Sequence, residues 1–279
     1  MNVLKIAAFS DGDTGGNPAG VVIADQLPPD DEMQQIAAEV GFSETAFAAR
    51  ADNDNGWRVR YFSPAAEVPF CGHATIALGA ALALKQGDGV FPLVLNRTAI
   101  TVEAWRSGEL VSAALQSPPT RSAPVPAALL AEALDLFGFT QENLDHRIAP
   151  ALIHGGADHL LLMLDSRQTL AEMQYDFDTG RALMIREGWA TILLAHAETP
   201  QRFNTRNPFA FGGVYEDPAT GAATAAFAGY LRDIQWPHEG GIEIVQGEDM
   251  GMRSLLRARI TPEAGSSIRV SGTARMMRS

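Results

Sequence analysis

The chain has 279 residues, of which 46% are hydrophobic and 19% charged, so it can form two domains and bury a sizeable core. Its 21 basic and 33 acidic side chains give a net charge of -12, the opposite sign to the one that a nucleic-acid backbone selects. These values exclude a disordered polymer and argue against DNA or RNA as a partner. They leave room for a local positive pocket that binds an anion.

The cysteine content and the apolar runs predict the compartment. Cys71 is the single cysteine and cannot form an internal disulfide, which is typical of a reducing environment. The first residues include no apolar segment of signal-peptide length, and the longest apolar run, residues 74–84, is too short to span a bilayer. We expect a soluble cytoplasmic protein with no membrane partner.

The first part of the chain is predicted to form short strands and two helices. Asp30–Val40 is typical of a helix with Asp30 as its N-cap, and Ala74–Lys85 is typical of a helix that is apolar on every face and therefore buried. The predicted strands are Val3–Phe9, Val21–Ala24, Trp57–Phe62, Phe91–Leu95, Ile100–Trp105 and Leu110–Leu115.

A polar, proline-rich stretch, Gln116–Pro126, then interrupts the pattern and is expected to be a linker or a long edge segment. After it, helices are predicted at Asp178–Glu187 and Ala222–Leu231, and the second of these is again apolar all round. Strands are predicted at His159–Asp165, Thr191–Ala195, Ile242–Gln246, Leu255–Ile260 and Ile268–Val270.

The two buried helices indicate an internal duplication. Each is introduced by Gly, Thr and Ala, and their openings at Cys71 and Pro218 lie about half the chain apart. Two unrelated Ala-rich helices would give the same pattern, and both explanations stay open. We predict an α+β fold of two pseudo-symmetric domains, each a curled, mostly antiparallel sheet around one buried helix. The expected boundaries are residues 1–120 and 121–260, with residues 261–279 as a final strand that returns to the first half.

The helix openings are candidate anion sites. A buried helix that begins with glycine presents backbone N–H groups and the positive end of its dipole, which suits a carboxylate. Gly72-His73 and Gly221-Ala222 are two such openings. The alternative is that these glycines only permit close packing of helix on sheet.

Three titratable residues are candidates for chemistry. Glu44 stands among apolar neighbours, and partial desolvation would suit its carboxyl group to proton transfer, although a loop glutamate is the simpler reading. His73 begins a helix whose dipole favours neutral imidazole, which can both donate and accept; a structural histidine is the alternative. Asp217 is expected to cap the second buried helix, or to hold a substrate amine or hydroxyl.

No metal and no cofactor are expected. His154, Asp158 and His159 lie close together in sequence, but no second cluster of ligands accompanies them. The sequence also has no glycine-rich nucleotide loop and no nucleophile elbow, so nucleotide binding and hydrolase chemistry find no support.

Five segments taken together resemble one family. The match runs in order over nearly the whole chain and is similar to the phenazine-biosynthesis PhzF family of isomerase-like proteins. The segments are Asn17-Pro18-Ala19-Gly20, Phe42-Ser43-Glu44-Thr45-Ala46-Phe47, Arg60-Tyr61-Phe62-Ser63-Pro64, Pro69-Phe70-Cys71-Gly72-His73-Ala74-Thr75 and Glu216-Asp217-Pro218-Ala219-Thr220-Gly221.

The resemblance implies a diaminopimelate-epimerase-like fold, an active site between the two halves, a homodimer and proton transfer without metal or cofactor. It implies that Glu44 is the acid/base, and that His73 and Asp217 are polar groups beside the substrate. It also implies a small-molecule carboxylate substrate. The residues that would bind this substrate are Asn17, Gly72, Gly221 and Ala222.

One departure from the family pattern affects the substrate. The family often has serine where Ala222 stands, and alanine lacks the hydroxyl that would reach the substrate. This argues against the dihydro-hydroxyanthranilate of phenazine biosynthesis as the substrate.

The sequence therefore predicts an isomerase that moves a proton on a small carboxylate-bearing molecule, and two alternatives stay open. One is a racemase or epimerase that uses Cys71 alone, because Pro218 occupies the position of an opposed second thiol. The other is a carboxylate-binding protein without catalysis.

Overall fold

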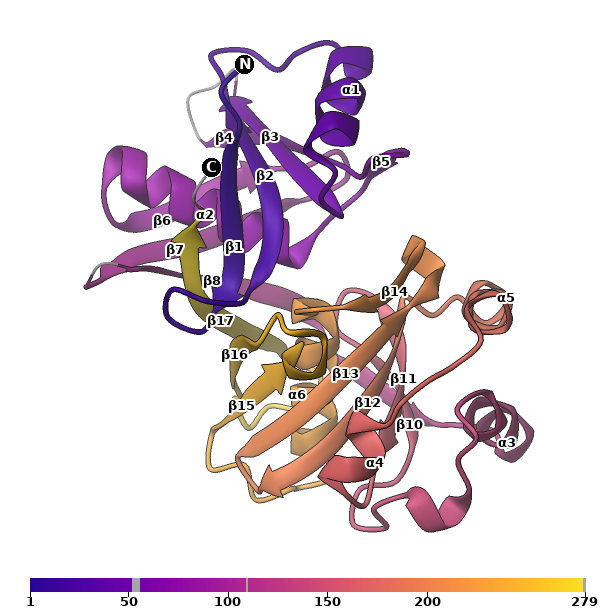
Figure 1. The fold of residues 1–279 in the computed structure, drawn as a ribbon. Coiled ribbons are helices and arrows are strands. Elements are labelled where there is room, and N and C mark those ends of the chain that lie inside the picture. The colour runs from indigo at the N-terminus through magenta and orange to yellow at the C-terminus, as the bar shows by residue number, and fades with distance from the viewer. Residues whose placement is uncertain (52–55, 109, 278–279) are drawn as a thin grey trace. The chain divides into compact units, whose positions relative to one another are not determined.

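The computed structural model describes residues 1–51, 56–108 and 110–277 (Figure 1). The contacts within the chain divide it into two compact units. Unit 1 comprises Met1–Gln116 and Ser271–Ser279, and unit 2 comprises Ser117–Val270.

Unit 1 combines strands with two helices, α1 (Asp30–Val40) and α2 (Gly72–Gln86). Strand β17 (Ser267–Met276) begins in unit 2 and ends in unit 1, where Ala274 pairs antiparallel with Ala8 of the first strand. The other strands are β1 (Leu4–Ser10), β2 (Asn17–Ile23), β3 (Glu44–Arg50), β4 (Trp57–Phe62), β5 (Glu67–Val68), β6 (Gly89–Val94), β7 (Ala99–Ser107) and β8 (Leu110–Pro119).

Unit 2 has helices α3 (Ala127–Leu136), α4 (Arg167–Ala171), α5 (Phe177–Glu187) and α6 (Gly221–Asp233). Short 3₁₀ turns lie at Gln141–Asn143, Ala210–Gly212 and Glu248–Met250. Its strands are β9 (Arg121–Pro124), β10 (Ala151–His154), β11 (Asp158–Met163), β12 (Thr191–Thr199), β13 (Arg202–Phe209), β14 (Val214–Asp217), β15 (Gly241–Gln246) and β16 (Ser254–Arg259).

The same order of strand pairing occurs in both units. In unit 1, β1–β2 is antiparallel, β2–β3 parallel, β3–β4 antiparallel, β4–β6 parallel and β6–β7 antiparallel. In unit 2, β10–β11, β11–β12, β12–β13, β13–β15 and β15–β16 alternate in the same way. The second parallel crossover of each unit contains the buried helix, α2 or α6. The predicted fold class of two pseudo-symmetric α+β domains is confirmed.

Both central helices are buried on all sides, as the sequence predicts. In α2 every residue from His73 to Ala83 is buried, and α6 is buried similarly from Ala223 to Arg232. Each helix has a glycine where another element comes too close for a side chain. A Cβ at Gly79 would lie 2.6 Å from Val102 Cγ2, and one at Gly229 would collide with Thr120. Small residues thus let sheet and loop approach the helix backbone.

One local expectation needs correction. Asp30 is not the N-cap of α1: Pro29 holds that position, and the Asp30 carboxylate pairs instead with Arg60 Nη1 at 2.5 Å. Of the two interpretations of residues 116–126, a linker or an edge segment, the strands observed there favour the second. Strand β8 continues to Pro119, and β9 pairs antiparallel with β10.

Unit 2 buries an ion pair between neighbouring strands β13 and β14. Arg206 Nε and Nη2 donate to the two carboxylate oxygens of Glu216 at 3.0 and 2.5 Å, and Nη1 donates to the Ala171 carbonyl at 2.9 Å. Burial by itself would lower the pKa of Arg206, but the bonds to Glu216 outweigh it, and the pKa lies above its ordinary value. This pair fixes the segment that leads to Asp217.

Glu216→Gln should lower the free energy of unfolding by about 3–5 kcal/mol, because it leaves a buried guanidinium without a counter-charge. The measurement is urea unfolding at neutral pH. Glu132→Gln is the matched control, since Glu132 makes a similar two-bond contact with Arg186 on the surface, and it should cause little change. Equal losses in the two variants would contradict this assignment.

Candidate functional site

In unit 1, the start of α2 lies beside the start of β3. Cys71 occupies the N-cap position of α2 with an extended backbone, and Gly72 is the first helical residue. Glu44 is the first residue of β3, which runs parallel to β2 with Glu44 opposite Ala19. Glu44 and His73 thus both stand at the beginning of an element, and their side chains meet there.

Three titratable side chains meet there, and we call Glu44, Cys71 and His73 the α2 cluster. His73 Nε2 lies 3.3 Å from Glu44 Oε2, and His73 Nδ1 lies 3.3 Å from Cys71 Sγ. Ser43 Oγ is also 3.3 Å from His73 Nε2. Glu44, His73 and Cys71 are only 9%, 6% and 9% exposed, so their polar groups are poorly hydrated.

One atom of the α2 cluster is unsatisfied. Glu44 Oε2 is buried and accepts no hydrogen bond, because its approach to His73 Nε2 lacks hydrogen-bond geometry. A buried carboxylate oxygen without a donor carries a free-energy cost of about 1–3 kcal/mol or more. Such an oxygen is ready to take a proton from a molecule that reaches it.

A hydrogen-bond chain beneath the α2 cluster fixes the beginning of the helix. Thr75 Oγ1 donates to the Cys71 carbonyl at 2.7 Å, and Tyr61 Oη lies 2.7 Å from Thr75 Oγ1. Tyr61 is fully buried, and this burial raises the pKa of its hydroxyl above the ordinary value. Tyr61 therefore acts as a neutral anchor for the first turn of α2.

Asn17 and Gly72 lie near the same elements. Asn17 is the first residue of β2 and is buried, and it stands two residues before Ala19, which is opposite Glu44. Because alternate residues of a strand share a face, Asn17 and Glu44 project on the same side of the sheet. The N–H groups in the first turn of α2 have no acceptor within the helix.

In unit 2, Asp217 ends β14 just before α6 begins at Gly221. The predicted capping of α6 by Asp217 is wrong, because Thr220 is the N-cap residue. Asp217 Oδ2 instead accepts a hydrogen bond from Thr220 Oγ1 at 2.5 Å. Gly221 is buried and Ala222 is partly exposed in the first turn, whose N–H groups again lack intrahelical acceptors.

Gln246 is a residue that the sequence prediction missed. Its Oε1 accepts from the Thr220 N–H at 3.1 Å, and its Nε2 donates to the Asp217 carbonyl at 2.7 Å. Gln246 thereby links β15 to the turn that precedes α6. Its only signal in the sequence is a Gln-Gly pair at the end of a predicted strand.

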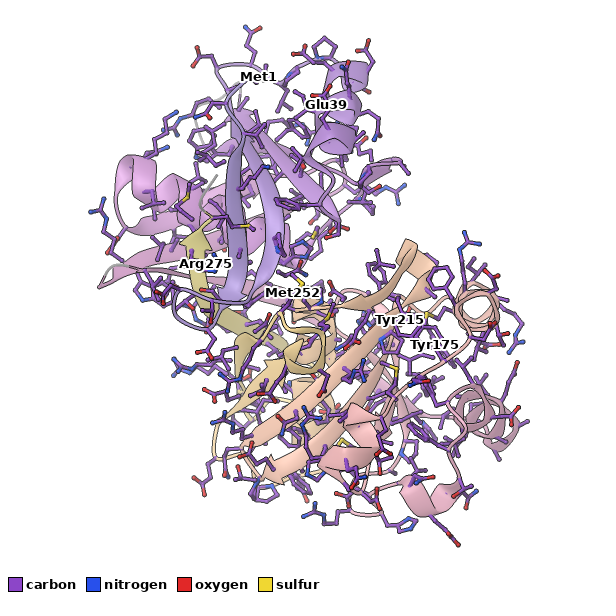
Figure 2. The ribbon with its side chains drawn as sticks, in the orientation of Figure 1. Met1, Glu39, Tyr175, Tyr215, Met252 and Arg275 are labelled. Atoms are coloured by element: carbon purple, nitrogen blue, oxygen red, sulfur yellow. The ribbon has the colours of Figure 1, made fainter. Side chains whose placement is uncertain are left out.

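Tyr215 of β14 contacts Tyr175, and both are labelled in Figure 2. The rings of Tyr175 and Tyr215 stack with centroids 4.4 Å apart. The Tyr175 N–H donates to Tyr215 Oη at 2.9 Å, and Tyr175 Oη donates to the Tyr215 carbonyl at 2.5 Å. Tyr215 and Glu216 are thus both anchored, which leaves Asp217 little freedom.

His154, Asp158 and His159 do not form one cluster, because only His154 contacts Asp158. His154 Nδ1 lies 2.7 Å from Asp158 Oδ1, whereas His159 Nδ1 donates to Thr191 Oγ1 at 2.8 Å in the interior. Thr191 Oγ1 in turn donates to Asn207 Oδ1 at 3.0 Å. His159 Nε2 is buried without a partner, and burial lowers the pKa of His159 to about 3.

Acid should therefore destabilise the fold through His159. The unfolded chain binds a proton near the ordinary histidine pKa of 6.5, while the folded chain does so only near 3. Stability is fully present above about pH 6.5 and falls as the pH drops towards 3, by up to about 1.4 kcal/mol per pH unit.

Urea unfolding of wild type and His159→Asn between pH 7.0 and 4.5 measures this effect. In His159→Asn the free energy of unfolding should fall less with decreasing pH than in wild type. In the exposed control His146→Asn it should fall as in wild type. An unchanged slope in His159→Asn would refute the role of this buried imidazole.

Within the residues that the structure describes, no helix is long and apolar enough to cross a membrane.

Known proteins resemble this chain over nearly its whole length. The profile of the PhzC-PhzF family, described as phenazine biosynthesis-like protein, matches residues 6–279. A trans-2,3-dihydro-3-hydroxyanthranilate isomerase from Pseudomonas aeruginosa is 34% identical over 281 residues, covering 96% of this chain and 94% of the relative. An uncharacterized isomerase from the same species is 30% identical over 256 residues, covering 91% and 88%.

A solved structure has the same fold. The crystal structure of a PhzF-family phenazine biosynthesis protein from Bacillus anthracis superimposes with a TM-score of 0.87. The superposition covers 100% of this chain and 98% of that one at 20% sequence identity, which shows likeness of fold.

Proposed function

This chain belongs to the PhzC-PhzF family of phenazine biosynthesis-like proteins, and on that premise we propose that it is a proton-moving isomerase. The substrate class is a small carboxylate-bearing molecule, and the reaction needs neither metal nor cofactor. The observation that supports this most directly is the buried Glu44 Oε2, which has no hydrogen-bond partner and lies 3.3 Å from His73 Nε2. Relatives named as isomerases support the reaction class.

The proposed reaction begins and ends with Glu44 as carboxylate. It takes a proton from a substrate carbon, and the electron pair of the broken C–H bond spreads into the conjugated substrate. The same carboxyl group then delivers the proton to a second carbon, so no net oxidation or reduction occurs. His73, next to Glu44, orients the substrate, which keeps its atoms throughout.

Backbone amides are the proposed means of binding the anionic end of the substrate. The first N–H groups of α2, at Gly72 and His73, point along the helix axis with the positive dipole end and favour negative charge. The same argument applies to Gly221 and Ala222 in α6. We assign further polar substrate contacts to Asn17 and Asp217.

The absence of a side-chain hydroxyl at Ala222 narrows the choice of carboxylate substrate. Three of the relatives are named as isomerases of trans-2,3-dihydro-3-hydroxyanthranilate. A side-chain hydroxyl at position 222 would add a hydrogen bond of about 1 kcal/mol, and alanine offers none. We therefore propose a carboxylate with an acidic C–H bond that does not depend on a hydroxyl donor at this position.

Glu44→Gln should abolish isomerisation while largely preserving substrate binding, because glutamine keeps the size of the side chain but cannot accept the proton. General acid–base catalysis contributes about 10²–10⁴-fold to rate, and a loss in this range is expected. Turnover is measured by NMR on a panel of small unsaturated carboxylates that includes trans-2,3-dihydro-3-hydroxyanthranilate.

Glu39→Gln is the control for this experiment. Glu39 lies exposed on α1 of the same unit (Figure 2), and its substitution should leave the rate unchanged. A Glu44→Gln enzyme with nearly the wild-type rate would eliminate Glu44 as the base.

A second candidate mechanism uses the Cys71 thiol as the base of an epimerase. It is favoured by the 3.3 Å distance between Cys71 Sγ and His73 Nδ1 and by the position of Cys71 at a helix N-terminus. The glutamate mechanism predicts that Cys71→Ser keeps most of the wild-type rate, since serine is close in size to cysteine.

Alkylation distinguishes the two mechanisms. Rapid inactivation by iodoacetamide that substrate prevents, together with a 10²–10⁴-fold loss in Cys71→Ser, would establish the thiol as the base. Slow alkylation and an active serine variant would leave Glu44 in that role.

A further inference from the structure

The α2 cluster has the composition of a metal site as well as that of an acid/base site. Cysteine, histidine and glutamate are the three side chains that bind zinc most often through sulfur, nitrogen and oxygen. Their potential ligand atoms in Glu44, Cys71 and His73 all lie within 4.8 Å of one another. We propose that this cluster reversibly binds a thiophilic divalent cation such as Zn²⁺ through Cys71 Sγ, His73 Nε2 and Glu44 Oε2.

Two of the distances between the ligand atoms come close to the edges that a tetrahedral ion requires. Zinc bonds of about 2.3 Å to sulfur and about 2.0–2.1 Å to nitrogen or oxygen require edges of about 3.6 Å for S···N and about 3.3 Å for N···O. The observed separations are 3.9 Å from Cys71 Sγ to His73 Nε2 and 3.3 Å from His73 Nε2 to Glu44 Oε2. Cys71 Sγ lies nearer to His73 Nδ1, at 3.3 Å, so the Cys71 and His73 side chains must rotate before the sulfur and Nε2 can reach the same ion.

The unsatisfied oxygen of Glu44 is a second, independent observation. Glu44 Oε2 is buried and accepts no hydrogen bond, and an ion at the centre of the cluster would satisfy it. The Glu44 side chain is 12% exposed, so the ion would be held in a poorly hydrated place. The fourth corner stays open for water or a substrate oxygen, as in zinc sites with three protein ligands.

The donor set predicts which ions bind. A thiolate with an imidazole favours Zn²⁺ and Co²⁺, while Mg²⁺ and Ca²⁺ prefer oxygen ligands. Binding requires the loss of the Cys71 proton, so affinity should rise with pH. The other group that the sequence suggested does not compete, because His159 bonds to Thr191 in the interior while His154 pairs with Asp158.

The proposed site has a consequence for activity, which rests on the proposed function. A cation that coordinates Glu44 Oε2 occupies the oxygen that would take the substrate proton. Zn²⁺ should therefore inhibit the isomerase, and a chelator should restore it. The metal acts here as a reversible inhibitor, because the proposed proton transfer needs none.

Cobalt spectroscopy tests the site without any substrate. Chelator-treated, reduced full-length protein is titrated with Co²⁺, and the absorption spectrum is followed. We expect one equivalent to give a sulfur-to-cobalt charge-transfer band in the near ultraviolet together with intense visible bands of tetrahedral Co²⁺. One equivalent of Zn²⁺ should then remove both. Mg²⁺ at the same concentration should leave them unchanged.

Variants assign the ligands. Cys71→Ala should eliminate the charge-transfer band, and His73→Ala and Glu44→Gln should each weaken Co²⁺ binding at least about tenfold, since metal sites lose such factors even when only supporting groups are removed. The double substitution His154→Ala and Asp158→Ala is the control and should retain the full spectrum. Melting temperatures verify that each variant is folded, and Cys71→Ser replaces Cys71→Ala if the latter is not.

Absence of the charge-transfer band in the wild-type protein would overturn the proposal, as would a band that persists in the cysteine variant. The spectrum does not depend on turnover, so its outcome is separate from that of the isomerase assay. If the cobalt bands appear but no substrate is isomerised, the cation site is supported and the proposed function is refuted. Undiminished isomerisation at saturating Zn²⁺ would overturn Glu44 as a shared ligand and base.

Discussion

Each unit of this protein is built around a helix that has no face to turn towards water. Helices α2 and α6 consist largely of Ala, Gly and other small or apolar residues, and sheet and loops must enclose them. The first N–H groups of such a helix find no acceptor within the helix, and so polar partners must collect at its beginning. Buried polar side chains lie there in both units: Glu44, Cys71 and His73 at the beginning of α2, and Asp217 and Gln246 at the beginning of α6.

The two units share a topology and differ in chemistry at the equivalent place. In unit 1 the helix opening carries a thiol, an imidazole and a carboxylate whose Oε2 atom has no hydrogen-bond donor. In unit 2 the side chain of Gln246 and the hydroxyl of Thr220 bond to Asp217 and to each other. This difference supports the proposal that the proton is transferred at Glu44 in unit 1. The net negative charge of the chain does not prevent binding of an anionic substrate, because helix N-termini supply local positive potential.

The sequence predicted the elements whose burial pattern is simple, and it missed those where polar groups are buried. The helix Asp30–Val40 and the strand Trp57–Phe62 have the predicted bounds, and both buried helices were recognised because they are apolar on every face. Strand β13 was missed because Asn204, Thr205, Arg206 and Asn207 are polar in sequence yet buried against neighbouring strands. Asp30 and Asp217 were wrongly expected to be N-caps. The N-cap residues are Pro29 in α1 and Thr220 in α6, and neither position stands out in the sequence. The family motifs singled out Glu44, His73 and Asp217, but the contact of Cys71 with His73 depends on side-chain directions that spacing does not encode.

Isotope transfer during turnover in D₂O tests most directly whether a single carboxyl group carries the proton. If Glu44 both removes and returns it, a buried carboxyl group that exchanges slowly with solvent will return part of the original hydrogen. The product should then contain less than one equivalent of deuterium at the new C–H position, measured by mass spectrometry and NMR from the first turnovers. Full incorporation from the first turnover, with inverted configuration at the same carbon, would contradict a single shuttling carboxylate and indicate a two-base epimerase.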